Sequence, residues 1–248
     1  MRVSPATWLV MVQPWQEVGE PLARADMSLG DFEPGQEIVS IGGGEGRFAI
    51  WVAERQHAQV EAVDPDPAAV ARGEAAARRL SMTRRPRIQL GSPTDLPHES
   101  GVFDGAIVDF LTLGPVPVPS VLGEAARVLK PYGVLVALAP VWHEPPAPEV
   151  RKELATRLGV TAHLAVQWKQ WLRAAGLVEI VIRDYPGAAW AIDSRVSAMI
   201  RGRRVAGWQG VRAALSPAAR MFWREIARRR LGLTLLRGVR WPEQPAAS

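Results

Sequence analysis

Glycine occupies alternate positions at Gly42, Gly44 and Gly46, directly after an apolar run, in the stretch IVSIGGGEG of residues 38–46. A residue without a side chain lets the backbone approach a ligand closely. If a helix begins after these glycines, its free N–H groups also favour a negatively charged group there. The spacing therefore predicts a ligand-binding turn between a strand and a helix.

An acid follows at a distance that fits the same ligand. Asp64 closes the apolar run QVEAVD and lies 22 residues after Gly42. From this spacing a carboxylate can accept hydrogen bonds from both hydroxyls of a ribose. The glycines and the acid together leave open a dinucleotide or an S-adenosyl compound.

Only a sheet with parallel strands brings such residues to one edge, and the apolar runs alternate with helical patterns in the order that it requires. Asp66 before Pro67 is typical of a helix start, as is Ser216 before Pro217. The sequence predicts a doubly wound α/β fold. Its predicted strands are residues 37–42, 59–64, 87–91, 105–110, 134–140 and 177–185, and its predicted helices are residues 47–55, 67–80, 120–130 and 163–175.

Four segments carry a more specific resemblance. They are IVSIGGGEGRFAIWVAE, VEAVDPDPAAVARGEAAARR, GSPTDLPHESGVFDGAIVDF and EAARVLKPYGVLVALAP. In this order they resemble the motifs of class I S-adenosylmethionine-dependent methyltransferases, over roughly residues 35–185, and most closely the branch that contains the quinone C-methyltransferases. The phrase RVLKPYGVLVA discriminates best, because nucleotide dehydrogenases have no reason to carry it.

The resemblance implies a Rossmann-like, mostly parallel sheet of seven strands and S-adenosyl-L-methionine as cofactor. Residues 233–241 would form the seventh strand, antiparallel, beside the fifth, and the rest of the C-terminal region a helical cover. The implied cofactor-binding residues are Gly42, Gly43, Gly44, Gly46, Asp64, Pro65, Ser92, Pro93, Asp109 and Phe110.

Within this set the resemblance assigns separate parts of the cofactor. Gly42 to Gly44 would lie against the methionine part and the ribose, Asp64 would hold the two ribose hydroxyls, and Pro65 would pack on the adenine. Asp109 and Phe110, at the end of the fourth strand, fall where the family lines the methyl-donor pocket.

Adenine recognition departs from the family pattern. The family usually has an acid or asparagine after the glycine of GSPTDLP, and then a residue whose backbone N–H donates to the ring. Here these positions hold Ser92 and Pro93. Serine can still bond to the adenine amino group, but proline has no N–H to donate. Asp95 either substitutes for the missing acid or caps the turn before Pro97.

Methyl transfer requires alignment of the reacting atoms and exclusion of water, and it requires a base only if the nucleophile carries a proton. The candidate catalytic residues are Asp109 and, as a base, His143 in the loop after the fifth strand. His57 and His98 are expected on the surface, and His163 at a helix start. No histidine pair has metal-ligand spacing with acids, so no catalytic metal is predicted.

Charge divides the chain unevenly. Residues 1–150 carry 12 Lys and Arg against 19 Asp and Glu, whereas residues 151–248 carry 18 against 6. The predicted units are an N-terminal helical lid segment (residues 1–34), the methyltransferase domain (residues 35–185) and a basic, Trp-rich extension (residues 186–248). Arginines and tryptophans together suit an anionic or lipid-like substrate, a membrane surface, or RNA.

The absence of cysteine excludes disulfides and thiol chemistry, and no run of 18 uncharged apolar residues predicts a membrane span. A cytoplasmic protein is expected. Methylation of a small-molecule substrate is the leading hypothesis, because the apolar residues of the tail are at core spacing and nothing resembles an RNA-binding module. RNA methylation is the second hypothesis, and a non-catalytic S-adenosyl-binding protein is the third.

Overall fold

A computed structural model of the chain describes residues 28–42, 46–55, 57–79, 86–185, 199, 203 and 207–242. The strands are β1 (Glu37–Ile41), β2 (Gln59–Asp64), β3 (Arg87–Leu90), β4 (Phe103–Asp109), β5 (Leu129–Trp142), β6 (His163–Leu164), β7 (Leu177–Tyr185) and β8 (Leu231–Arg240). The helices are α3 (Arg47–Arg55), α4 (Pro67–Arg78), α5 (Phe110–Leu113), α6 (Val118–Val128), α7 (Pro148–Leu158), α8 (Ala165–Ala174) and α11 (Pro217–Ala227).

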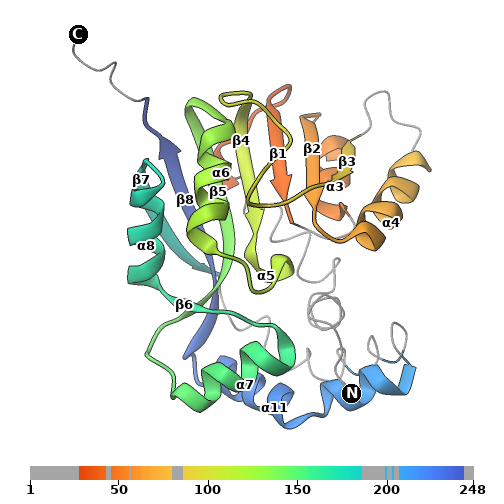
Figure 1. Cartoon of the computed structure of the whole chain (residues 1–248), viewed down its shortest axis with the longest axis vertical. Coiled ribbons are helices and arrows are strands. Elements are labelled where there is room, and N and C mark those ends of the chain that lie inside the picture. Colours follow the sequence, from red (N-terminus) through yellow and green to blue (C-terminus); the bar gives the residue numbers. More distant parts are fainter. Residues whose placement is uncertain are drawn as a thin grey trace.

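The strands form one sheet in the order β3-β2-β1-β4-β5-β8-β7, and the two-residue β6 adds only to β5 (Figure 1). The pairs from β3 to β5 are parallel, whereas β8 runs antiparallel to both β5 and β7. This confirms the predicted doubly wound, seven-stranded sheet with an antiparallel last strand. β8 lies beside β5, as expected, and it also separates β5 from β7.

Two helix starts show why the local sequence folds as predicted. The side chain of Asp66 accepts a hydrogen bond from the N–H of Ala68 at the start of α4, and Ser216 accepts one from Ala219 at the start of α11. Each cap satisfies an N–H group that has no partner within the helix, and a proline follows each cap at the first helical position.

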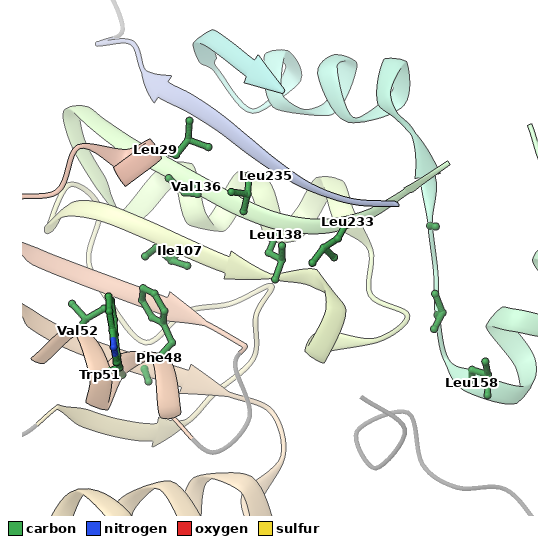
Figure 2. Packing of buried hydrophobic residues seen from close by; sticks show 14 of the residues in the cluster. Leu29, Phe48, Trp51, Val52, Ile107, Val136, Leu138, Leu158, Leu233 and Leu235 are labelled. Atoms are coloured by element: carbon green, nitrogen blue, oxygen red, sulfur yellow. The ribbon is translucent and has the colours of Figure 1, made fainter. Parts of the chain in front are cut away.

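Apolar side chains fill both faces of the sheet. On one face, side chains of α3 pack under Ile107, Leu138 and Leu233 from three neighbouring strands (Figure 2). On the other face, α6 and α8 cover a second cluster that includes Leu122 and Leu172. Burial of this apolar surface on both faces supplies the main driving force for the fold.

The structure differs from the sequence prediction after the fourth strand. Residues 111–119 were expected to form a loop, but α5 and the start of α6 occupy most of them. β5 is twice as long as expected, and α7 was not predicted at all. α7 buries only Leu154 and Leu158, so its amphipathic pattern is weak. Pro148 at its start and Gly159 after its end are nevertheless residue types typical of helix ends.

The helices α7 and α11 contact each other and lie beyond the carboxyl ends of β4 and of the strands beside it (Figure 1). They belong to the apolar cluster that continues along β5 and β8. Within the described ranges, no helix has the length and apolarity to cross a membrane.

Truncation of Phe222 tests whether α11 belongs to the core. This side chain is 2% exposed and lies edge-on to Trp223. We expect Phe222→Ala to lower the free energy of unfolding by about 3–5 kcal/mol, because it removes buried surface and leaves a cavity. Leu215→Ala, at a side chain that is 52% exposed, should cost about 0.5 kcal/mol or less. Urea denaturation followed by circular dichroism measures both, and equal losses would show that α11 is only loosely attached.

Candidate functional site

The turn after β1 is held on both sides by the neighbouring strands. Gly42 has a φ of 74°, and its N–H donates to the carbonyl oxygen of Val63 over 2.9 Å. A Cβ added there would lie 3.0 Å from the carbonyl oxygen of Asp109 and 2.8 Å from Cγ of Leu113. Only glycine accepts this conformation in this space. The end of β1 therefore touches the ends of β2 and β4.

Gly46, at the start of α3, makes the next close approach. Its φ is 66°, and an added Cβ would lie 2.5 Å from Cδ1 of Ile88 on β3. The predicted binding residues Gly43 and Gly44 lie outside the described residues. Gly42 and Gly46, which flank them, both lie at the carboxyl edge of the sheet, where ligands bind in this class of fold.

Asp64 ends β2 beside this turn. The residue is 7% exposed, and its Oδ1 accepts a hydrogen bond from the N–H of Asp66 over 2.8 Å. Its own carbonyl oxygen accepts from the N–H of Gly91, which follows β3. The next residue, Pro65, is exposed. The structure thus brings Gly42, Asp64 and the loop after β3 to the same edge of the sheet.

The loop after β3 carries the residues expected near adenine. The Ser92 hydroxyl accepts a hydrogen bond from the N–H of Thr94 and lies 2.9 Å from the Thr94 hydroxyl. Ser92 is exposed, whereas Pro93 is buried, and the N–H of Asp95 donates to the carbonyl oxygen of Ser92. The Ser92 hydroxyl therefore already has a role inside the turn.

An ion pair on α6 anchors the same loop. Oε2 of Glu124 accepts from the N–H of Leu96 over 2.9 Å and from Nη2 of Arg127 over 2.8 Å. The Arg127 guanidinium donates in turn to the carbonyl oxygens of His98 and Leu96. The hydrogen bond from Arg127 and that from the Leu96 N–H lower the pKa of Glu124. The carboxylate stays ionised, and the loop keeps its place at the edge.

Asp109 closes β4 at the glycine turn. Its Oδ1 accepts from the N–H of Thr112 over 3.2 Å, which caps α5. The adjacent Phe110 is 4% exposed and packs edge-on to Trp168 of α8, with ring centroids 4.9 Å apart. Asp109 is therefore close to the turn that begins at Gly42, whereas the Phe110 ring belongs to the core on the α8 face.

The structure does not bring His143 to this edge. Asp109 lies opposite Leu138 in the sheet, and His143 follows five residues later, on the order of 16 Å further along the chain. An odd separation also places the two side chains on opposite faces. His143 Nδ1 lies 3.9 Å from a carboxylate oxygen of Asp184, and its ring covers Gly232. Its predicted catalytic role stays a prediction.

The other histidines divide by burial. His57 is exposed, as predicted. His98 was expected on the surface, but its side chain is only 9% exposed, and its Nε2 lies 2.9 Å from Oε2 of Glu61. His163 lies in β6, just before α8, where burial and the nearby Arg151 charge lower its pKa. Within the described ranges, no group of histidines and acids could hold a metal ion.

A hollow of about 150 Å³ lies at the amino ends of β1 to β3, lined in part by Glu37, Glu61 and Arg87. This is the end of the sheet opposite to Gly42 and Asp64. The glycine turn, and not this hollow, has the backbone geometry of a cofactor site in a doubly wound sheet.

Comparison with known proteins agrees with this geometry. Residues 38–133 match the family model of a methyltransferase domain. The curated erythromycin 3''-O-methyltransferase of Saccharopolyspora erythraea is 26% identical over 181 residues, which cover 68% of this chain and 59% of that protein. The chain therefore spans less than two thirds of the length of this relative.

Solved structures share the fold over most of the chain. A geranyl diphosphate C-methyltransferase from Streptomyces coelicolor A3(2), in complex with Mg2+, geranyl diphosphate and S-adenosyl-L-homocysteine, has a TM-score of 0.69 at 17% identity and covers 91% of this chain and 80% of its own. The [4+2]-cyclase SpnF has a TM-score of 0.66 at 22% identity, and the match covers 92% of this chain and 83% of the SpnF chain. The class I methyltransferase fold is confirmed, while the narrower resemblance to quinone C-methyltransferases stays a prediction.

Gly42→Ala tests the contact that closes the site. The positive φ alone should cost about 1–2 kcal/mol, and the Asp109 carbonyl cannot move without disturbing β4. We expect a clear loss of stability by urea denaturation. The matched control is Gly123→Ala in α6, where an added Cβ meets nothing within 4 Å. That change should raise the free energy of unfolding by up to about 1 kcal/mol, because alanine has a higher helix propensity than glycine. Equal stability of the two variants would contradict the proposed close approach.

Proposed function

We propose that this chain, whose residues 38–133 match a methyltransferase domain, is an S-adenosylmethionine-dependent methyltransferase that binds its cofactor along the carboxyl ends of β1 to β4. The observation that carries the proposal is the position of Asp64, a buried carboxylate beside the glycine turn. A methyltransferase motif and a site at the expected edge of the sheet point to the same ligand.

The residues at this edge suit the parts of the cofactor. Asp64 accepts the ribose hydroxyls, and its bond from the Asp66 N–H fixes the orientation of the carboxylate. The backbone from Gly42 to Gly46 lies against the ribose and the methionine part, because any side chain at Gly42 would collide with β4. The exposed Pro65 offers an apolar surface to the adenine.

Adenine is held differently from the usual family pattern. The Ser92 hydroxyl and the N–H of Asp95 are engaged within their own turn, and Pro93 has no N–H. The Asp95 carboxylate is exposed in the same loop and can accept from the adenine amino group. Asp95 is therefore our choice for the acid that the family places at the position of Ser92.

S-adenosylmethionine supplies a methyl carbon activated by the attached sulfonium. The chain holds the donor and acceptor in line and excludes water. Asp109 is better placed than His143 to contact the reacting groups, because it adjoins the glycine turn and the Thr112 N–H orients its carboxylate. Beyond this edge, α7 and α11 form an apolar layer that can close over a substrate.

The substrate is a small molecule with substantial apolar surface, and anionic or lipid-like compounds remain within this class. The apolar layer of α7 and α11 favours it, and the two methyltransferases described above are named for erythromycin and for geranyl diphosphate.

Two alternatives rest on particular observations. The basic tail suggested RNA as a substrate. However, Trp223 is buried, Arg230 pairs with Glu144, and Arg237 pairs with Glu179. Trp190 lies outside the described residues, whereas Trp208 is exposed with Arg203 over its ring. The match to a cyclase keeps a protein that binds an S-adenosyl ligand without methyl transfer as the other alternative.

Calorimetry with S-adenosylhomocysteine tests the cofactor site. We expect the wild-type chain to bind it and Asp64→Ala to lose most of the affinity, because each hydrogen bond to a charged acceptor contributes on the order of 1.5–3 kcal/mol. Glu99→Gln, an exposed change in a neighbouring loop, should bind like the wild type. Binding of NAD in place of S-adenosylhomocysteine would overturn the proposal, and an effect of Asp64→Ala below about twofold would place the ribose elsewhere.

Filter binding separates a small-molecule enzyme from an RNA methyltransferase. We expect no submicromolar affinity for RNA at about 150 mM salt, because two arginines of the tail, Arg230 and Arg237, are already paired within the fold. Tight binding that weakens steeply with salt would mean that the tail neutralises several phosphates and would favour the RNA alternative.

A further inference from the structure

The sheet ends at β7, on the side opposite to β3 (Figure 1). In the described part of the chain, β8 is the only strand that pairs with β7, so the outer edge of β7 has no strand beside it. Val178 and Val181 of this strand are 36% and 38% exposed. A free strand edge presents N–H and C=O groups that can pair with another chain. The outer edge of β7 is therefore a candidate interaction surface.

Side chains alternate between the two faces of the sheet along this strand. Ile180 and Ile182 are half-buried and pack against the apolar cluster that α6 and α8 cover. Val181 and Arg183 therefore project from the other face. The sheet register agrees, because Arg183 lies opposite Leu235, which belongs to the cluster on that other face.

Two opposite charges flank Val181 on this second face. Glu179 precedes Val181 by two residues, and Arg183 follows it by two. Oε2 of Glu179 lies 3.6 Å from Nη1 of Arg237, the residue opposite Val181, so Glu179 shares the face of Val181. The Glu179 side chain is still 64% exposed. Arg183 is exposed too, and it makes no ion pair within the described ranges. Both charges are thus available to a partner.

The run Glu-Ile-Val-Ile-Arg of residues 179–183 is complementary to a reversed copy of itself. If two copies pair antiparallel with Val181 opposite Val181, each Glu179 lies opposite Arg183 of the other copy. Each Ile180 then lies opposite an Ile182. Opposite charges and apolar β-branched pairs both stabilise an antiparallel pair when they face each other directly. The charges therefore favour this one register.

We propose that a second copy of this chain pairs with the outer edge of β7 as an antiparallel strand, related to the first by a two-fold axis at Val181. Such a dimer closes at two copies, because each copy uses its β7 edge once. β5 and β8 separate β7 from β4, so each copy keeps its own glycine turn free of the interface. The inference does not depend on the reaction that the chain catalyses.

The shape of β7 limits the length of this pairing. The register against β8 shifts between Val178 and Val181, and Glu179 has a φ of 49°. A bulge of this kind bends and twists its strand. A short pairing centred on Val181 is therefore expected, and not a long flat one of the kind that leads to aggregation.

Reversal of one charge tests the register. Arg183→Glu places two carboxylates opposite each other on each side of the axis, so we expect the dissociation constant of the dimer to rise about 10-fold or more in sedimentation velocity. The control is Arg79→Glu, at an exposed arginine after α4, which packs on β2 and β3 at the other side of the sheet. This control changes the net charge equally and should leave the dimer intact. A wild-type chain that stays monomeric at all concentrations would overturn the inference.

Mixing two variants separates a specific contact from a general loss of stability. Glu179→Arg should also weaken the dimer, although it additionally replaces the contact with Arg237. In an equimolar mixture with Arg183→Glu, every reversed charge meets an opposite charge across the axis. We expect association to return only in this mixture. Two folded variants, by circular dichroism, that do not associate when mixed would contradict the proposed register.

A disulfide tests the axis without any change of charge. The chain has no cysteine, and residues directly opposite in an antiparallel pair have Cα atoms about 4.5–5.5 Å apart, which a disulfide can span. Mild oxidation should therefore convert most of Val181→Cys into a covalent dimer that a thiol reductant separates. Leu90→Cys, at a 56% exposed residue of the other edge strand, β3, should remain monomeric on the same non-reducing gel. No cross-linking of Val181→Cys, or equal cross-linking of both variants, would overturn the proposed axis.

Discussion

The approach of Gly42 to the end of β4 is the contact on which the whole carboxyl edge depends. Its N–H is bonded to β2, and the space where a side chain would stand is occupied by the Asp109 carbonyl and Leu113. One residue therefore sets the register of three strand ends. Gly46 extends the same arrangement to β3 through Ile88. Backbone contacts to Val63 and Asp109 and side-chain contacts to Leu113 and Ile88 therefore hold both ends of the glycine stretch.

The antiparallel β8 supports the layer that the proposed function assigns to the substrate. It pairs with β5 from Val134 to Trp142 and so supports β5 well past the level at which β4 ends. The extended strands carry α7 and α11, which lie over the edge. In the proposed function, the cofactor half thus comes from consecutive strand and helix units, and the substrate half from α7 and from α11 near the end of the chain. This division explains how one sheet serves proteins with different substrates, since the second half changes independently of the first.

Local chemistry decides which parts could be predicted from the sequence. The caps at Asp66 and Ser216 and the glycine at Gly42 act on their nearest neighbours, so their residue types reveal their structure. The length of β5 and the two-residue β6 depend on partners more than 20 residues away. The position of His143 could not be predicted from the sequence of its loop for a related reason. Its side-chain direction depends on a strand that continues to Trp142, two residues further than the apolar run suggested.

Burial of polar residues is the feature that is hardest to predict from local sequence. His98 and Glu225 both lie in segments that read as surface, one in a turn rich in polar residues and the other among arginines. The structure places His98 against Glu61 and Gln89 inside the protein, and it leaves Glu225 only 5% exposed. Desolvation makes each burial unfavourable unless a partner replaces the lost water. For His98 the chain supplies that partner, and the result is a fixed loop beside the cofactor edge.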